Sequence, residues 1–195
     1  WGGPGTGVHD TPKLDKIIEK IIPDPLVRLE DVKGGAAHIA QVSPEVIEQV
    51  NVSGSYWPKI GSMLFTGHIG LNCQRFPFNN KLIRNAIVRA IDYEGIISLY
   101  HGCGERWQDP IPNGLPGRDP SIPLFERNIE EAKRMLDEAG YPDGKDIPDL
   151  KLIHDPMFML SSRLAEIVQA NIAELGLNMT IEGMTSAAHS AVESM

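Results

Sequence analysis

The sequence predicts an α/β fold in which parallel strands are flanked by helices. Three observations indicate this class: a short apolar run at residues 150–153, an apolar stripe at helical spacing over residues 161–175, and alternating apolar side chains at residues 177–181. Tight connections between a strand, a helix and a second strand favour parallel, right-handed pairing of the two strands. We therefore expect a βαβ unit in this part of the chain.

A helix is predicted immediately before this unit, at residues 129–139. Asn128 is a suitable N-cap, and Glu131 stands where a capping-box carboxylate reaches back to the cap. Gly140 follows at the position where helices often end in the left-handed conformation. Apolar residues recur at helical spacing: Ala132, Met135, Leu136 and Ala139.

Similar boundary signals mark the helix of the βαβ unit. We expect Ser161 or Ser162 to cap it and Gly176 to end it. The residues of its apolar stripe are Leu164, Ile167, Val168, Ile172 and Leu175. The apolar positions of the strand that follows are Leu177, Met179 and Ile181.

Three further elements are predicted in the first fifty residues. Residues 14–22 are rich in apolar side chains and run into a Pro-Asp-Pro turn signal at residues 23–25, so we predict a strand there. Residues 26–34 suit a short helix that ends at a glycine. Ser43 followed by Pro44 is a typical helix start, with serine as the cap and proline at the first helical position.

A longer helix is predicted from Asn79 or Asn80 to Tyr100. Residues 102–123 then contain many Gly and Pro residues and predict a long loop, and long loops inside compact domains are often functional. The predicted inner face of the helix comprises Ile83, Ile87, Ala90 and Ile91.

Composition and charge narrow the classes of protein to consider. The chain has 195 residues, enough for one domain or two small ones, with 42% apolar and 23% charged residues, as is usual for globular proteins. The formal net charge is -8 and no basic face is evident, which argues against a general nucleic-acid binder. No apolar run approaches the ~20 residues that a membrane-spanning helix needs.

Metal binding and disulfide formation both have candidate residues. Cys73 and Cys103 are the only cysteines, and the sequence allows either one disulfide or two thiols. His101, Cys103 and Glu105 alternate on one segment, but zinc sites usually draw on two spaced ligand pairs and no second pair is present. We therefore predict no metal site and no cofactor, and leave the disulfide open.

Motifs of catalysis are missing from the sequence. The glycines of residues 2–7 follow no strand and lack the Lys-Ser/Thr of a P-loop, so a flexible loop is the favoured interpretation. No nucleophile elbow, zinc-protease helix or kinase signature occurs. Nothing in the sequence therefore argues for an enzyme.

Two places carry residues suited to ligand binding. Trp107 lies in the Gly/Pro-rich loop, where it either lines a cleft or anchors the loop on its own core. His154, Asp155 and Arg163 surround the start of the βαβ helix, at the carboxyl end of a strand, where open α/β sheets bind ligands. Arg163 either pairs with a ligand carboxylate or is a solvated helix residue.

Four stretches of the sequence resemble one protein family. Two of them are specific when they occur together: Phe76–Asp92, which reads FPFNNKLIRNAIVRAID, and Ala132–Gly144, which reads AKRMLDEAGYPDG. The others are Pro12–Ile18 and Gln169–Ile181. On these motifs the chain is similar to the family 5 solute-binding proteins of bacterial ABC importers, which include oligopeptide-, dipeptide- and nickel-binding proteins.

The resemblance implies part of a periplasmic-binding-protein clamshell, in which two α/β lobes close on a ligand about a hinge. Residues 1–70 would form the end of the first lobe and the approach to the hinge, and residues 71–195 most of the distal lobe. By position, Asn72 lies near the hinge crossing, Trp107 in a cleft-facing loop, and the segment from His154 through Asp155 to Arg163 where peptide binders contact ligand. We therefore expect the chain to be a piece of a larger protein.

The function implied by the resemblance is capture of a small solute for import, most simply a dipeptide or oligopeptide, without catalysis. The expected partners are the ligand and an ABC permease in the membrane, with no nucleic acid, and the full-length protein is expected to be a monomer. Its expected location is the periplasm, or the outer face of the membrane in a Gram-positive source. Two alternatives remain: an α/β enzyme fragment using His101, Glu105 or His154, and a signalling relative that keeps the clamshell.

Overall fold

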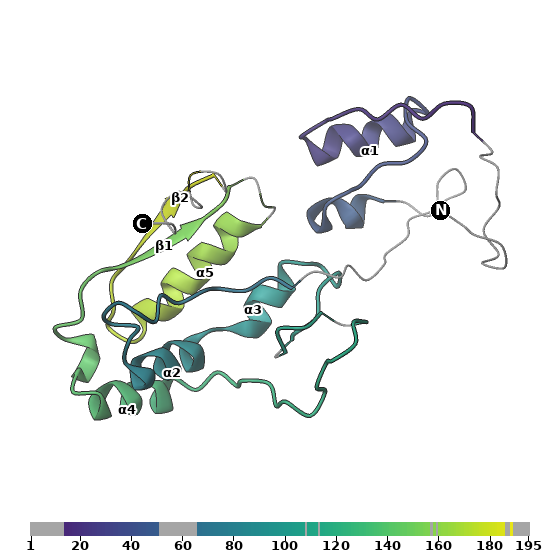
Figure 1. The fold of residues 1–195 in the computed structure, drawn as a ribbon. Coiled ribbons are helices and arrows are strands. Elements are labelled where there is room, and N and C mark those ends of the chain that lie inside the picture. Colours follow the sequence, from purple (N-terminus) through teal and green to yellow (C-terminus); the bar gives the residue numbers. More distant parts are fainter. Residues whose placement is uncertain are drawn as a thin grey trace. The chain divides into compact units, whose positions relative to one another are not determined.

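The computed structural model of the protein describes residues 14–50, 66–107, 109–112, 114–156, 158, 160–185 and 188 (Figure 1). The chain divides between Val42 and Ser43 into two compact units. The assignment of residues 1–70 and 71–195 to two lobes stays a prediction.

The first unit is organised by one helix, α1 (Pro25–Lys33). The Asp24 carboxylate starts the helix by accepting hydrogen bonds from the N–H groups of Leu26 at 2.8 Å and Val27 at 3.3 Å. The Arg28 guanidinium donates to the carbonyl oxygens of Ile22 at 2.6 Å and Gln41 at 2.7 Å, and so ties together the segments before and after the helix. The predicted helix is confirmed.

The predicted strand at residues 14–22 is wrong, because these residues form no strand in the structure. Their large apolar side chains are exposed, with Ile17 at 80% and Ile21 at 93%. A strand is held by hydrogen bonds to a neighbouring strand, and within the described part of this unit no other strand is present to pair with it.

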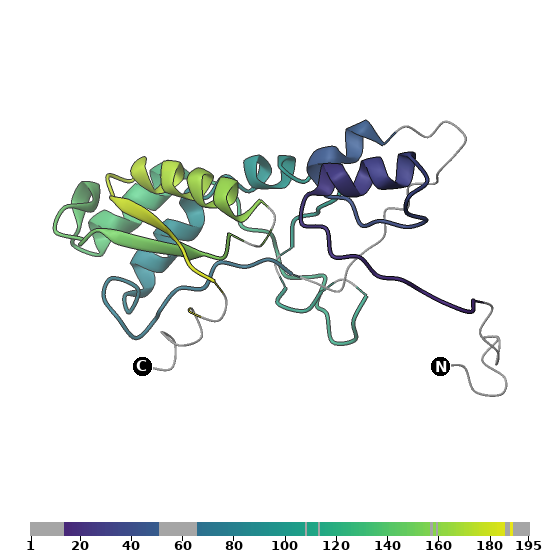
Figure 2. The same ribbon diagram turned by 90° about the horizontal axis from the view of Figure 1, so that it is seen from above.

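The second unit contains the predicted βαβ arrangement. Strand β1 (Leu150–His154) and strand β2 (Met179–Gly183) pair in parallel, from Leu150 opposite Met179 to His154 opposite Gly183. Helix α5 (Ser161–Ala173) connects them and packs on both strands, and Figure 2 shows it lying along one face of the pair. The prediction of a parallel βαβ unit is confirmed.

The core of this unit forms where α2 (Lys81–Ala90) packs against α4 (Ile129–Glu138) and against α5. The predicted inner face of α2 is buried, as are Ala132 and Leu136 of α4, whereas Met135 and Ala139 are partly buried. No helix in the described residues is both long and apolar enough to cross a bilayer. The buried cluster comprises Ile83, Ala86, Ile87, Ala90, Ile91, Ala132, Leu136, Leu150, Val168, Ile172, Leu175 and Leu177.

The single helix predicted up to Tyr100 is wrong in its second half. Helix α2 ends at Ala90, and a separate helix, α3 (Tyr93–Ser98), begins after it. The break occurs at Asp92, whose backbone N–H donates to Asn171 Oδ1 at 2.8 Å and whose carboxylate caps Gly95 N at 3.0 Å. A buried asparagine of α5 thus replaces the helical hydrogen bond at this point.

The caps of α4 and α5 differ from the sequence prediction in detail. Asn128 caps α4, accepting from Glu131 N at 2.9 Å, but its own N–H donates to the Arg89 carbonyl oxygen at 2.7 Å, so the reciprocal capping-box bond does not form. Neither serine caps α5, because Leu160 occupies the N-cap position with φ of 66° and Ser161 is the first helical residue.

Two 3-10 helices complete the described elements, η1 (Pro44–Gln49) and η2 (Pro142–Gly144). The helix start at Ser43 and Pro44 is therefore confirmed in position, although the helix is of the 3-10 type. Gly176 ends the α5 region as predicted: its φ is 77°, and a Cβ there would lie 2.2 Å from the Asp143 carbonyl oxygen.

Candidate ligand-binding site at the carboxyl end of the strand pair

The two parallel strands end side by side, and polar groups gather at this edge. His154 is the last residue of β1 and lies opposite Gly183, the last residue of β2. The chain then turns through Asp155 to the start of α5 at Ser161. Ligands of open α/β sheets bind outside the carboxyl ends of the strands. This edge is therefore the candidate site.

Backbone and side-chain hydrogen bonds hold the edge in place. The Ser161 hydroxyl donates to the Asp155 carbonyl oxygen at 2.7 Å, and Ser161 Oγ lies 3.0 Å from His154 Nδ1. The N–H of Phe158 also donates to the Asp155 carbonyl oxygen, at 3.0 Å, and the N–H of Met184 donates to the His154 carbonyl oxygen at 2.8 Å. The imidazole therefore has a fixed position and is half-buried.

Arg163 lies in the first turn of α5, and its side chain pairs with Glu45. Its side chain is 61% exposed, and Nη1 lies 3.8 Å from Glu45 Oε1 in η1. An exposed ion pair at this distance contributes little, on the order of 1 kcal/mol or less. The pair with Glu45 therefore restrains the Arg163 side chain only weakly.

Trp107 is held inside its own loop. Its indole N–H donates to the Ile111 carbonyl oxygen at 2.7 Å, and the Arg118 guanidinium lies 4.0 Å from the ring centroid. The buried Asp109 carboxylate accepts from the N–H groups of Ile111 at 2.8 Å and Asp119 at 2.5 Å. Because the indole N–H of Trp107 already has a partner, Trp107 could offer only its ring surface to a ligand.

Asn72 forms a local turn. Its side-chain oxygen accepts from Gln74 N at 3.1 Å, and its carbonyl oxygen accepts from Arg75 N at 3.2 Å. The structure thus brings His154 and Asp155 together and places Arg163 on the same helix start. Asn72 and Trp107 make their contacts in their own segments. The ligand-binding roles of all of these residues stay predictions.

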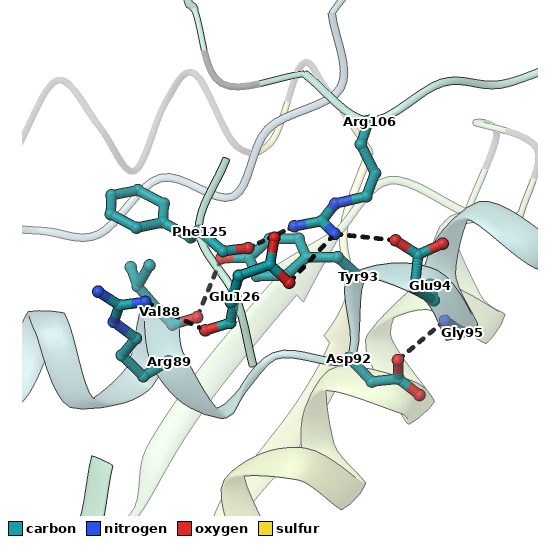
Figure 3. Close-up of polar contacts among 9 residues, drawn as sticks. All are labelled: Val88, Arg89, Asp92, Tyr93, Glu94, Gly95, Arg106, Phe125 and Glu126. Atoms are coloured by element: carbon teal, nitrogen blue, oxygen red, sulfur yellow. Dashed lines mark hydrogen bonds and ion pairs between the residues drawn. The ribbon is translucent and has the colours of Figure 1, made fainter. Parts of the chain in front are cut away.

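Sequence reasoning missed a cluster of charged and aromatic side chains around Arg106, which Figure 3 shows in close-up. Nη1 of Arg106 lies 2.8 Å from Glu94 Oε1 and 3.9 Å from Glu126 Oε2, and Nη2 donates to the Phe125 carbonyl oxygen. The guanidinium also lies 4.9 Å from the ring centroid of Tyr93. The members come from three separate segments, so no spacing in the sequence could reveal them.

Tyr93 is the member of this cluster with a perturbed acidity. Its hydroxyl donates to the Val88 carbonyl oxygen at 3.0 Å. Burial raises the pKa of the Tyr93 phenol above its ordinary value, although the positive charges of Arg106 and Arg89 oppose the rise. The cluster joins the start of the long loop at Arg106 to its end at Phe125, and we assign it a structural role.

Other candidate features lie apart from the strand edge. An open hollow of about 300 Å³ is lined by Phe76, Asn79, Asn80 and Tyr141. Cys73 and Cys103 are free thiols, exposed and half-buried respectively. Within the described residues, no group of three or more His, Cys, Asp or Glu side chains is arranged to hold a metal ion. The glycine-rich segment at residues 2–7 lies outside those residues.

Comparison with known proteins identifies the family. The family described as bacterial extracellular solute-binding proteins, family 5 Middle, matches residues 1–194. The chain belongs to this family. It is 28% identical over 173 residues to heme-binding protein A of Haemophilus influenzae, covering 84% of this chain and 30% of that protein. It is 25% identical over 173 residues to the dipeptide-binding protein of Escherichia coli, covering 87% and 32%.

Among solved structures, the chain is similar to the ABC transporter-associated periplasmic binding protein DppA from Helicobacter pylori in complex with peptide STSA. The TM-score is 0.68 at 26% identity, covering 86% of this chain and 32% of that one. The predicted fold class, part of a periplasmic-binding-protein α/β fold, is therefore confirmed. This family 5 chain spans about a third of the length of the relatives it matches. These relatives are binding proteins, which supports the prediction that the chain is not an enzyme.

Proposed function

We propose that the larger protein to which this chain belongs captures a peptide and delivers it to an ABC permease for import. The observation that carries the proposal is the match to the family 5 solute-binding proteins over residues 1–194. Peptide is favoured as the solute because one similar protein is named as a dipeptide-binding protein and another is solved with a bound peptide. The family's description as extracellular supports a location in the periplasm or on the outer face of the membrane.

The mechanism is closure of two lobes on the ligand, with no bond made or broken. A ligand shifts the open-to-closed equilibrium only by as much as it binds the closed state better. The strand edge at His154 and Asp155 supplies one set of contacts, and the opposite lobe supplies the other. Extended peptides suit such a cleft because their main-chain N–H and C=O groups can bind irrespective of side chains.

The predicted site residues take separate roles in this proposal. Arg163 pairs with the carboxylate of the peptide after releasing Glu45, from which it lies 3.8 Å. Trp107 offers apolar ring surface to a ligand side chain, since its N–H is already used. Asn72 belongs to the turn near the hinge. The full-length protein acts as a monomer without a cofactor or nucleic acid.

Calorimetric titration of the full-length protein with a library of di- to pentapeptides tests the proposal. We expect saturable binding of at least one peptide class, weakened by Arg163→Ala and unaffected by Arg134→Ala, an exposed helix arginine that pairs with Glu138. A protein that binds no peptide contradicts the peptide assignment.

Heme is the second candidate solute, because one relative is named as a heme-binding protein. Titration with hemin, followed by its absorbance, tests this ligand in the same preparation. Binding of hemin with no peptide binding would replace the peptide by heme and leave the capture role intact.

A further inference from the structure

The hydrogen bonds around His154 fix which ring nitrogen carries the proton. Ser161 Oγ lies 2.7 Å from the Asp155 carbonyl oxygen and 3.0 Å from His154 Nδ1. A carbonyl oxygen can only accept, so the single hydroxyl proton of Ser161 points to Asp155. Because the hydroxyl oxygen is then an acceptor toward the ring, Nδ1 must hold a proton and donate it to Oγ.

The other ring nitrogen, Nε2, consequently holds a lone pair when the imidazole is neutral. It faces Gly183, which ends the neighbouring strand opposite His154. A Cβ built on Gly183 would lie 3.7 Å from Nε2 and 3.7 Å from Pro156 Cγ. The absent side chain therefore leaves room for a group the size of a Cβ between Gly183, Pro156 and Nε2, and we call this space the notch.

We propose that His154 Nε2, reached through the notch at Gly183, accepts a hydrogen bond from an N–H group of the bound peptide. This inference rests on the proposed function, because it assigns a contact at the same site. His154 is the ligand-contacting residue, and Ser161 is a positioning residue that holds the ring in the required tautomer.

The arrangement selects ligands by hydrogen-bonding polarity. A main-chain amide of an extended peptide supplies an N–H that matches the lone pair of Nε2. A carbonyl or carboxylate oxygen placed there would face another acceptor, and both lone pairs would be desolvated without a partner. The edge therefore favours ligands that present donors toward β1.

Nuclear magnetic resonance of the ring nitrogens tests the tautomer directly in the full-length protein. We expect the His154 ring to be protonated at Nδ1 in the wild type, to lose this preference in Ser161→Ala, and to regain it in Ser161→Thr, which restores a hydroxyl. Ser98→Ala is the matched control, because the Ser98 hydroxyl also donates to a carbonyl oxygen at 2.7 Å, that of Gly95. A wild-type ring protonated at Nε2 overturns the proposal.

Calorimetry with tetra-alanine, and with tetra-alanine methylated at each amide nitrogen in turn, tests the contact. Gly183→Val fills the notch and His154→Phe removes the lone pair, and each is expected to weaken binding about fivefold to tenfold, as the loss of one hydrogen bond does. Gly183→Ala, whose Cβ makes only an ordinary contact, is expected to weaken it less. One methylated peptide should lose affinity for the wild type but not for His154→Phe.

The failure of this inference is distinguishable from the failure of the proposed function. A wild-type protein that binds peptide, with variants of Gly183 and His154 that bind it equally well, overturns the inference and leaves peptide capture standing. A correctly folded wild type that binds no peptide overturns both the peptide assignment and this contact. Circular dichroism of each variant separates loss of binding from loss of fold.

Discussion

The two compact units of this chain differ in how deeply their apolar runs are buried. In the unit that begins at Ser43, the core residues of the helices and strands are at most 6% exposed. In the unit that ends at Val42, Leu29 is 3% exposed, whereas Ile17 and Ile21 are 80% and 93% exposed. Both units contain apolar runs. The difference shows that such a run becomes a strand only where the chain also supplies a neighbouring strand and a covering helix.

The largest expected effect comes from the core of the second unit. Leu136→Ala removes a side chain that is 0% exposed, so we expect it to lower the free energy of unfolding by about 2–5 kcal/mol. Ile17→Ala changes an 80% exposed side chain, and we expect a change within about 0.5 kcal/mol. Urea unfolding of the chain measures both values. Equal losses would abolish the contrast between the units.

Two glycines with the same φ, one in each unit, provide a second comparison of how tightly the units are packed. Gly35 and Gly176 both have φ of 77°, but a Cβ at Gly35 meets nothing within 4 Å, whereas one at Gly176 would lie 2.2 Å from the Asp143 carbonyl oxygen. Gly35→Ala should cost about 1–2 kcal/mol for the left-handed backbone alone. Gly176→Ala should cost about 2–4 kcal/mol, because the clash is added. Thermal unfolding followed by circular dichroism would reveal the difference, and similar values would mean that the close packing at Gly176 relaxes freely.

The N-caps of the two units offer a smaller test. Asn128→Ala and Asp24→Ala each remove a side chain that caps a helix, of α4 and α1 respectively, at a typical cost of about 1 kcal/mol. We expect Asn128→Ala to lower the unfolding midpoint of the second unit, because α4 is part of its core. Asp24→Ala should instead reduce the protection of α1 amides in hydrogen exchange, with the midpoint unchanged.

The smallest expected effect is a pH dependence that belongs to the second unit. Burial raises the pKa of Tyr93 above its ordinary value of 10.0, so the folded state holds the phenol proton more tightly than the unfolded state does. The resulting stabilisation is present in full below pH 10.0 and is lost as pH rises through the raised pKa. Unfolding free energies measured from neutral to alkaline pH should show this loss in the wild type and in Tyr141→Phe, but not in Tyr93→Phe.

Much of the second unit was predictable because its signals are local. The βαβ unit, α4 and their glycine stops depend on apolar spacing and on residues next to each boundary. The break between α2 and α3 was not predictable, since it depends on Asn171, which is distant in the sequence and whose side-chain oxygen accepts a hydrogen bond from the Asp92 N–H. Strand pairing for residues 14–22 is likewise a property of neighbours and not of the run itself.

The arrangement of the chain at the strand edge was predictable, but the hydrogen bonds there were not. A strand followed by a helix start placed His154, Asp155 and Arg163 at one edge. Ser161 was expected as a cap, but Leu160 takes that position with a left-handed backbone and Ser161 becomes the first helical residue. The contacts of Ser161 with His154 and the Asp155 carbonyl oxygen could therefore not be predicted from the sequence. The ion pair of Arg163 with Glu45 also joins segments that no motif relates.

The contacts of Arg106 with Phe125 and Glu126 affect how the length and sequence of the loop between them can vary during evolution. Once the two stems of a loop are fastened, the entropic penalty of lengthening it is small, about 0.6 kcal/mol for each doubling. Residues between the stems can therefore be inserted, deleted or exchanged while the core beneath stays folded.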